Sequence, residues 1–304
     1  MALRRWLHGL LFVVVLLIVV GASHRLTAGD QQGSQDFPEA RRLVIVDRAG
    51  QQTVLGEVPG NTWGPRVSSD GTRLTFARTG QQRDDDTLWV GPLMKPAEMR
   101  EIGPGRNPYW TEDGTRLFFS KAGTEILMWR RVEGDIEGEP LLEPVRAPES
   151  LSRDGRLLSY VQSVDNRFSA WTFDVKTRTR TAIPDAGPES LGTSISPDGR
   201  WIAYQSTKTG RHEVWVQPLG RTGPAVQVTT QGGFRPMWRG DMREMYYDDG
   251  NRQLFAVPIR TEPSFAMAGA AVALPIKGFV QTGVGRRQYD LLPDGRFVLM
   301  FPWE

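Results

Sequence analysis

Arginine is the residue type in this chain that is best placed to do chemistry. Six arginines fall in segments that we predict to connect strands: Arg66, Arg106, Arg146, Arg235, Arg286 and Arg287. A guanidinium group presents a planar fork of N–H donors that pairs with carboxylates and other anions. If the fold brings these segments together, they form an anion- or carboxylate-binding site, to which we add the neighbouring Trp63, Asn107, Glu149 and Phe234.

Other reactive groups are scarce. The sequence has no cysteine, so thiol catalysis and disulfides are excluded, and its three histidines are His8, His24 and His212. It has no Gly-x-Ser-x-Gly elbow and no phosphate-binding loop. The acidic run Asp84-Asp85-Asp86 lacks the alternating spacing of a calcium loop, and we interpret it as a solvated hairpin loop. We therefore predict no catalytic residue, no cofactor and no metal site.

The elements that must position the arginines belong to a repeat. An Asp-Gly-type turn occurs six times, at Asp70-Gly71, Asp113-Gly114, Asp154-Gly155, Asp198-Gly199, Asp241-Met242 and Asp294-Gly295. Successive turn aspartates lie 41 to 53 residues apart, and each turn is flanked by short apolar and aromatic runs that predict strands. A period of about 40–45 residues with several short strands is typical of β-propeller blades.

Within this repeat we assign structural roles to the turn aspartates and to a recurring aromatic residue. Aspartate accepts bonds from the turn backbone and glycine supplies a positive φ, so Met242 in place of glycine predicts a distorted turn or another turn type. The aromatic residues that recur after each turn predict packing between neighbouring blades: Trp89, Trp129, Trp171, Trp215 and Phe255.

The two ends of the repeat region complement each other. Residues 43–46 and 53–55 precede the first turn unit without strands of their own to pair with, and the sixth unit stops after two strands. Pairing them removes the open sheet edges at the seam. We predict an all-β fold for residues 42–304: a six-bladed β-propeller of four-stranded antiparallel blades, with the last blade closed by strands from both termini.

The N-terminus predicts export. Arg4 and Arg5 precede the apolar run of residues 10–20 and the small residues Gly21-Ala22-Ser23. Residues 1–23 are therefore a signal peptide or a helical membrane anchor. Both remain open, because the 18 uncharged residues 6–23 are at the lower limit for spanning a bilayer. We expect residues 24–41 to be a linker and the rest to lie outside the cytoplasm, periplasmic or secreted.

Two of the turn segments carry a resemblance. Ser196-Pro197-Asp198-Gly199-Arg200 and Leu292-Pro293-Asp294-Gly295-Arg296 resemble the Pro-Asp-Gly repeat of TolB-like propellers, relatives of the WD-repeat proteins. Gly232-Gly233-Phe234-Arg235-Pro236-Met237-Trp238 is similar to a subset found in exported bacterial proteins and in the sensor regions of receptor-like kinases. The resemblance covers residues 42–304 and implies the fold. It implies no kinase activity, because no kinase motif is present.

We therefore expect a non-catalytic scaffold or sensor that binds a protein, peptide or envelope ligand at the channel mouth. We expect a monomeric propeller that contacts the membrane only through its N-terminal segment. Nucleic acid is not an expected partner, because the formal charge of +2 comes from Arg4 and Arg5. One alternative is a carboxylate- or cation-dependent hydrolase or lyase that uses Asp290 and Glu149 in the channel. Another is an accessory subunit of a separate enzyme.

Overall fold

The part of the chain that folds as a propeller is almost entirely β-structure. The computed structural model describes residues 37–303, except residues 83, 135–137, 221–222 and 284. In these residues it contains strands β1 to β25 and one short 3₁₀-helix, η1 (Pro96–Glu98). The predicted signal or anchor (1–23) and most of the predicted linker (24–41) lie outside the described residues. Within them, no helix is long and apolar enough to cross a membrane.

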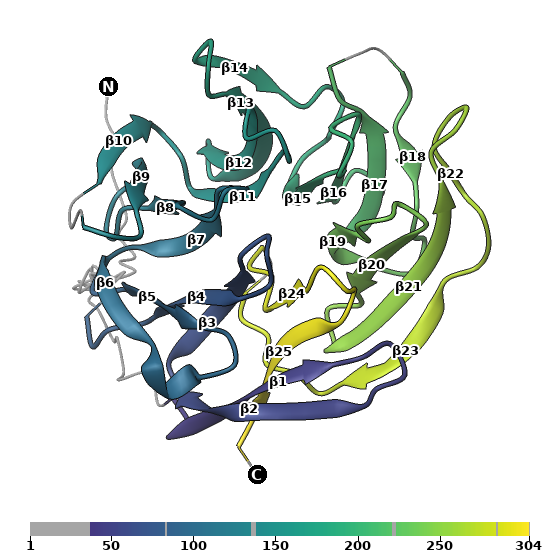
Figure 1. Cartoon of the computed structure of the whole chain (residues 1–304). Coiled ribbons are helices and arrows are strands. Elements are labelled where there is room, and N and C mark those ends of the chain that lie inside the picture. The colour runs from purple at the N-terminus through teal and green to yellow at the C-terminus, as the bar shows by residue number, and fades with distance from the viewer. Residues whose placement is uncertain (1–36, 83, 135–137, 221–222, 284, 304) are drawn as a thin grey trace, which may run out of the picture. The chain divides into compact units, whose positions relative to one another are not determined.

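Six antiparallel sheets form the blades (Figure 1). The first comprises β3 (Thr62–Val67), β4 (Arg73–Arg78), β5 (Thr87–Pro92) and β6 (Arg100–Pro104). The second comprises β7 (Arg106–Trp110), β8 (Arg116–Ser120), β9 (Leu127–Arg131) and β10 (Glu139–Leu142). The third comprises β11 (Ala147–Leu151), β12 (Leu157–Val164), β13 (Arg167–Asp174) and β14 (Thr179–Ala182).

The fourth blade comprises β15 (Leu191–Ile195), β16 (Trp201–Ser206), β17 (Glu213–Pro218) and β18 (Val226–Gln227). The fifth comprises β19 (Phe234–Trp238), β20 (Glu244–Asp248) and β21 (Gln253–Arg260), whose outer edge pairs with both β22 (Ala266–Met267) and β23 (Val272–Lys277). The sixth comprises β24 (Tyr289–Leu291), β25 (Phe297–Pro302), β1 (Ala40–Val46) and β2 (Gln52–Pro59). The six-bladed fold predicted from the turn repeat is thus confirmed, with a fifth strand in one blade.

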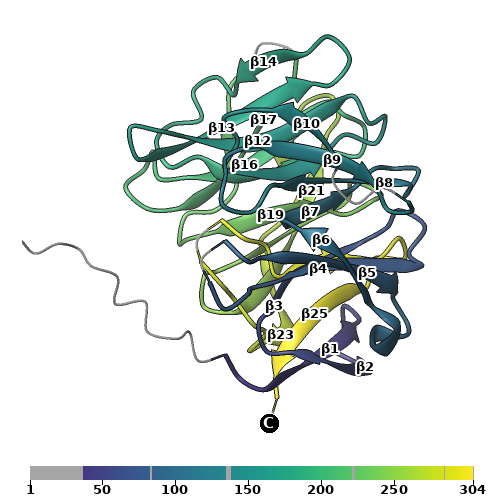
Figure 2. The ribbon, with the colours of Figure 1, turned by 90° about the vertical axis from the view of Figure 1, so that its left-hand side faces the viewer.

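The sixth blade joins the two ends of the propeller. Strand β1 pairs antiparallel with β25, from Arg41 opposite Pro302 to Val46 opposite Phe297, and β2 forms the outer edge (Figures 1 and 2). This pairing buries Leu43 and Val44 completely. The predicted closure by strands from both termini is confirmed.

Apolar side chains fill the spaces between neighbouring blades. In the described residues the core divides into six clusters, each made by the facing sides of two adjacent sheets. Most of the largest completely buried side chains are aromatic residues on the second strand of a blade, such as Phe76, Tyr160 and Tyr246. Strands of this kind are buried on both faces, so they read as nearly continuous apolar runs.

The recurring tryptophans lie nearer the surface than expected. Trp89, Trp129, Trp171 and Trp215 are only half-buried against the clusters. Three of them stack under cations: the Arg78 and Arg116 guanidinium carbons and the Lys208 Nζ lie 3.5, 4.3 and 3.6 Å from the ring centroids of Trp89, Trp129 and Trp215, respectively.

Two other tryptophans bond neighbouring blades directly. Trp110 Nε1 donates to the carbonyl of Arg66 at 3.0 Å, and Trp238 Nε1 donates to that of Ser194 at 2.9 Å. Each bond runs from one innermost strand to the innermost strand of the preceding blade.

The turn aspartates have the structural role predicted for them. Asp70 accepts from the hydroxyl of Ser68 at 2.5 Å and from the backbone N–H of Thr72 at 3.0 Å, and the other five make the equivalent backbone bond. The expectation of a distorted turn at Met242 was wrong. Met242 adopts φ +57°, within the left-handed region used by Gly199 (φ +70°), and its side chain packs against an apolar cluster. That packing offsets the steric cost of a positive φ at methionine.

Each of five innermost strands carries a bulge. In β3, for example, residues 64 and 65 lie opposite the single residue Phe76 of β4, and the same irregularity occurs in β7, β11, β15 and β19. Proline follows a left-handed residue at Gly64-Pro65, Asn107-Pro108 and Arg235-Pro236. Proline cannot donate a ladder hydrogen bond, so it is accommodated where the pairing is interrupted. In β11 the extra residue is Glu149.

Candidate functional site

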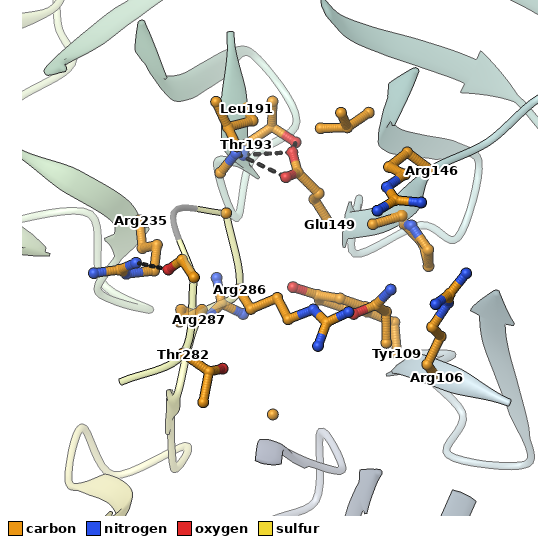
Figure 3. A pocket seen from close by; sticks show the side chains of 18 of the residues that line it. Arg106, Tyr109, Arg146, Glu149, Leu191, Thr193, Arg235, Thr282, Arg286 and Arg287 are labelled. Atoms are coloured by element: carbon orange, nitrogen blue, oxygen red, sulfur yellow. Dashed lines mark hydrogen bonds between the residues drawn. The ribbon is translucent and has the colours of Figure 1, made fainter. Parts of the chain in front are cut away.

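A cavity of about 350 Å³ lies where the innermost strands begin (Figure 3). It is lined by the first residues of β3, β7, β11, β15 and β19 and by residues 282–287 before β24, residue 284 aside. Nine of the ten residues predicted from sequence line it: Trp63, Arg66, Arg106, Asn107, Arg146, Glu149, Arg235, Arg286 and Arg287. The exception is Phe234, whose ring packs beside that of His212 at a centroid distance of 5.1 Å. Most of these residues belong to the bulged strands themselves rather than to the connections, where the sequence had suggested them.

Arg106, Arg146 and Arg286 form one charged wall of the cavity, which we call the arginine triad. The Arg286 guanidinium carbon lies 4.2 Å above the Trp63 ring. Burial lowers the pKa of Arg286, and the positive charges of Arg106 and Arg146 lower it further, against the opposing effect of Asp86.

Asp86 is a buried carboxylate beside the triad. Its Oδ2 lies 4.0 Å from Arg106 Nη1, and only 5% of the residue is exposed. The expectation that Asp84-Asp85-Asp86 is simply a solvated loop was therefore wrong for Asp86. Burial raises the pKa of Asp86, although Arg286 and Arg106 favour its charged form. One carboxylate shared between two arginines leaves the triad with a net positive charge.

Three side chains form the floor of the cavity. Arg66 Nη2 donates to the Tyr109 hydroxyl at 3.1 Å, and Arg66 Nη1 donates to the carbonyl of Arg287 at 3.1 Å. The guanidinium carbon of Arg287 lies 5.9 Å from the Tyr109 ring centroid. All three side chains also line a second cavity of about 270 Å³ on the side of the Asp-Gly turns.

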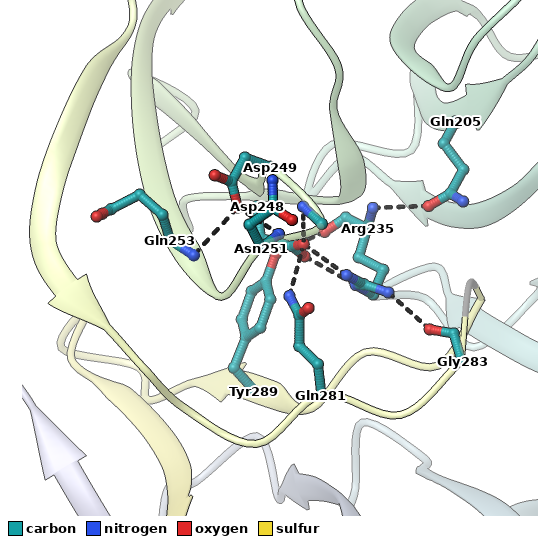
Figure 4. Close-up of polar contacts among 10 residues, drawn as sticks. Gln205, Arg235, Asp248, Asp249, Asn251, Gln253, Gln281, Gly283 and Tyr289 are labelled. Atoms are coloured by element: carbon teal, nitrogen blue, oxygen red, sulfur yellow. Dashed lines mark hydrogen bonds and ion pairs between the residues drawn. The ribbon is translucent and has the colours of Figure 1, made fainter.

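Arg235 has a different role, as the buried member of an ion pair (Figure 4). Its Nε and Nη2 donate to Asp248 Oδ2 and Oδ1 at 2.8 and 2.5 Å, and the two residues are 3% and 0% exposed. Asp248 also accepts from Gln281 Nε2 at 2.8 Å, and Arg235 Nη1 donates to the carbonyl of Gly283 at 3.0 Å. These bonds attach the segment that carries Arg286 to the fifth blade.

Glu149 faces the same cavity from the third blade. Its Oε1 accepts from the Gly192 N–H at 2.7 Å, and its Oε2 accepts from both the N–H and the hydroxyl of Thr193 at 2.7 Å (Figure 3). Burial raises the pKa of Glu149 to about 7, against these hydrogen bonds and the charge of Arg287, which favour ionisation.

The two carboxylates considered for catalysis do not share a site. Glu149 lines the first cavity and Asp290 lines the second. Asp290 Oδ2 accepts from the Val67 N–H at 2.9 Å, and its Oδ1 lies 3.5 Å from Arg287 Nη2. Both carboxylates hold neighbouring blades together. Among the described residues, no group of three or more His, Cys, Asp or Glu side chains is arranged to hold a metal ion.

Tyr109, Thr193, Phe168 and Leu191 also line the cavity, although they were not predicted from the sequence. Tyr109 and Thr193 are detectable from the repeat, because they occupy the same bulged registers as Arg66 and Glu149. Phe168 belongs to a long β12–β13 hairpin, and no repeat signal marks it. With Val161 and Leu191, it adds an apolar part to the lining of the cavity.

No family model matches the chain. A segment of 86 residues is 31% identical to an uncharacterized protein of Agrobacterium fabrum, and the match covers 28% of this chain and 29% of that protein. The chain thus matches less than a third of the length of that curated relative.

Solved structures resemble the whole propeller. A structure of a putative TolB from Agrobacterium tumefaciens matches with a TM-score of 0.66 at 17% identity, over 87% of this chain and 99% of that one. TolB from Acinetobacter baumannii matches with a TM-score of 0.56 at 16% identity, over 77% of this chain and 64% of that one. A chain of a nidogen/laminin complex matches with a TM-score of 0.56 at 11% identity, over 72% and 89%. At these identities the likeness shows the fold: this chain folds as a six-bladed β-propeller similar to those of the TolB structures.

Proposed function

We propose that this chain is a non-catalytic binding scaffold or sensor that acts outside the cytoplasm. Its ligand is a protein, a peptide or an envelope component, which places an anionic group against the arginine triad. The observation that carries the proposal is the convergence of Arg106, Arg146 and Arg286 on one cavity, where they outnumber the two buried carboxylates in or beside it, Asp86 and Glu149. The extracytoplasmic location rests on the export signal predicted for residues 1–23.

Electrostatics support an anion as the recognised group. Of the other three arginines that line the cavity, Arg235 is neutralised by Asp248, Arg287 lies beside Asp290, and Arg66 bonds to neutral oxygens. The cavity therefore has an excess of positive charge. Arg106 and Arg286 are half-buried and attract an anion more strongly than they would in water, whereas Arg146 is exposed. A ligand that supplies a carboxylate or another anion gains charge-assisted hydrogen bonds from these guanidinium groups, and that of Arg286 is already held against the Trp63 ring.

The apolar part of the cavity lining supports a ligand that is more than a simple ion. Val161, Phe168 and Leu191 offer contact area to a hydrocarbon group next to the anion. Ligand sites commonly combine such apolar walls with a few placed polar groups. An acidic or C-terminal peptide residue has this combination.

The proposal is tested by recovering partners from cell-envelope extracts with the purified chain, in wild-type form and as the triple variant Arg106→Ser/Arg146→Ser/Arg286→Ser. A discrete partner that binds the wild type and is lost from the triple variant is the expected result. The matched control replaces three exposed arginines, Arg131, Arg243 and Arg260, by serine and retains the partner. A partner bound equally by both triple variants would show that the arginine triad is not the binding site.

A further inference from the structure

Glu149 is an unusual residue for a cavity that attracts anions. It is the extra residue of the β11 bulge, it is 6% exposed, and it lines the same cavity as the arginine triad. Its direct hydrogen-bond partners are the backbone of β15 and the hydroxyl of Thr193, not a guanidinium group. Its negative charge is thus stabilised by neutral donors.

A chain of hydroxyl groups provides partners for both protonation states of this carboxyl. When Glu149 is ionised, the Thr193 hydroxyl donates to Oε2 at 2.7 Å. When Glu149 is protonated, its O–H can donate to Thr193 Oγ1, because the Thr193 hydroxyl can turn to Ser159 Oγ, 2.8 Å away. Ser159 Oγ in turn lies 3.3 Å from the carbonyl of Ser150. Hydroxyl groups both donate and accept, so the direction of these hydrogen bonds can reverse without a change in the fold.

The surroundings of Glu149 favour a carboxyl that titrates near neutral pH. The β15 residues that face it, Leu191, Gly192 and Thr193, are uncharged. On β12, Tyr160 packs into an apolar cluster, and Val161 lines the cavity. The ionisable groups that line the cavity with Glu149 are Tyr109 on β7 and the six arginines Arg66, Arg106, Arg146, Arg235, Arg286 and Arg287. Burial disfavours the ionised form and raises the pKa of Glu149 to about 7, while Arg287 opposes that rise.

We propose that an anion entering the arginine-lined cavity binds together with a proton, which Glu149 takes up. The inference rests on the proposed function, since it requires that the cavity binds an anion. A second negative charge in a cavity of this size repels the Glu149 carboxylate, and protonation of Glu149 removes the repulsion. By linkage, proton uptake on binding and stronger binding at lower pH are the same effect.

Sulfate is a suitable probe, because it remains a dianion throughout the range from pH 5.5 to 9. Isothermal titration calorimetry at pH 8, in two cationic buffers with different ionisation enthalpies, gives the number of protons taken up per sulfate bound. We expect an uptake approaching one proton at pH 8 and close to zero at pH 5.5. The affinity should fall by up to about tenfold per pH unit above pH 7 and be nearly constant below pH 6.

Glu149→Gln removes the titrating group and should abolish both the proton uptake and the pH dependence while sulfate still binds. Glu112→Gln is the matched control, because Glu112 lies at the other end of the channel. The Glu112→Gln variant should take up as many protons per sulfate bound as the wild type does. If Glu149→Gln does not fold, the infrared C=O band of a protonated carboxyl reports the proton uptake instead. It should grow when sulfate is added at pH 8, both in the wild type and in Asp86→Asn, which lacks the other buried carboxyl beside the triad.

The outcomes separate the two proposals. Sulfate binding that is equal at pH 6 and pH 8 without proton uptake overturns the inference and leaves the proposed function intact. Proton uptake that persists in Glu149→Gln overturns the inference as well. No sulfate binding at any pH, or binding that the triple serine variant of the arginine triad retains, counts against the proposed function itself.

Discussion

Arg66 and Tyr109, on the innermost strands of the first and second blades, contact each other in the channel of the propeller. Arg66 Nη2 donates to the Tyr109 hydroxyl at 3.1 Å, and the guanidinium carbon lies 4.7 Å from the centroid of the Tyr109 ring. Because both side chains line the cavities on either side, they separate a ligand-sized cavity of about 350 Å³ from one of about 270 Å³ near the Asp-Gly turns. The partition thus gives the first cavity a polar boundary on the side of the Asp-Gly turns.

Tyr109→Phe tests the hydrogen bond in this partition. The ring stays under Arg66, but Arg66 Nη2 loses its hydrogen-bond acceptor, and Arg66 is only 7% exposed. We expect the free energy of unfolding to fall by about 1 kcal/mol. Tyr109→Ala also removes the ring and its cation–π contact, and we expect a larger loss of about 2–3 kcal/mol. Urea denaturation followed by tryptophan fluorescence measures both, and equal stability of Tyr109→Phe and the wild type would contradict the assigned role.

Asp248→Asn tests the buried ion pair with Arg235. The substitution removes the charge of the carboxylate that pairs with the Arg235 guanidinium, which is 3% exposed, and puts an amide nitrogen among the donors of Arg235, Gln281 and Gly250. Removing one partner of a buried pair costs about 3–5 kcal/mol. Because Arg235 and Gln281 hold the segment before β24, the variant should also bind anions more weakly.

The neighbouring residue supplies the control for Asp248→Asn. Asp249 is half-buried, and its Oδ1 accepts from the N–H groups of Asn251 and Gln253, which an asparagine oxygen can still do. We expect Asp249→Asn to lower the free energy of unfolding by less than about 1 kcal/mol. Similar losses in the two variants would show that the charge of Asp248 contributes little.

The blades, the turns and the closing seam could be predicted from sequence, because each depends on local chemistry that repeats. In an Asp-Gly turn such as Asp198-Gly199, the carboxylate accepts a hydrogen bond from the backbone of the same turn. The role of the aspartate is therefore the same in every repeat. The burial of Asp86 and the pairing of Arg235 with Asp248 depend on side chains that approach from different strands, and no spacing in the sequence records them. The bulges lie between these cases. A proline marks three of the bulges in the sequence, each after a residue that the structure shows to be left-handed. Which side chains a bulge turns into the channel follows only from the strand register.

Asp70→Ala tests the turn network. Asp70 accepts from Ser68 Oγ, Thr72 N and Thr72 Oγ1 at 2.5, 3.0 and 2.8 Å, whereas Asp241 accepts from the Arg243 N–H and lies 3.5 Å from Arg239 Nε. We expect Asp70→Ala to cost about 1–2 kcal/mol at pH 7 and Asp241→Ala a few tenths.

The pH dependence of the Asp70→Ala effect has a definite sign. The Ser68 hydroxyl, followed by the bonds from Thr72, lowers the pKa of Asp70 to about 2. A carboxyl whose pKa is lower in the folded state stabilises the fold at pH values above its pKa in the unfolded chain, and this contribution is lost as the pH falls through the folded value. The difference between wild type and Asp70→Ala should therefore narrow between pH 4 and pH 2. A difference that stays constant over this range would contradict the assigned hydrogen bonds.

Glu149 should make the stability of the fold depend on pH in the opposite sense and in a different range. Its pKa is raised from the ordinary value of 4.5 to about 7, chiefly by burial, so between these values the folded chain binds more protons than the unfolded chain. The free energy of unfolding therefore falls as the pH rises from 4.5 through 7, by an amount on the order of 3 kcal/mol, and is flat above that.

In Glu149→Gln this slope should be missing. The amide nitrogen faces the Thr193 N–H and lowers the stability of the variant by a constant amount, so the slopes are the quantity to compare. Because the contributions of Asp86 and His212 are common to both proteins, the difference between the two curves isolates Glu149. Parallel curves from pH 4.5 to 7.5 in urea denaturation would show that Glu149 does not change its protonation state in this range.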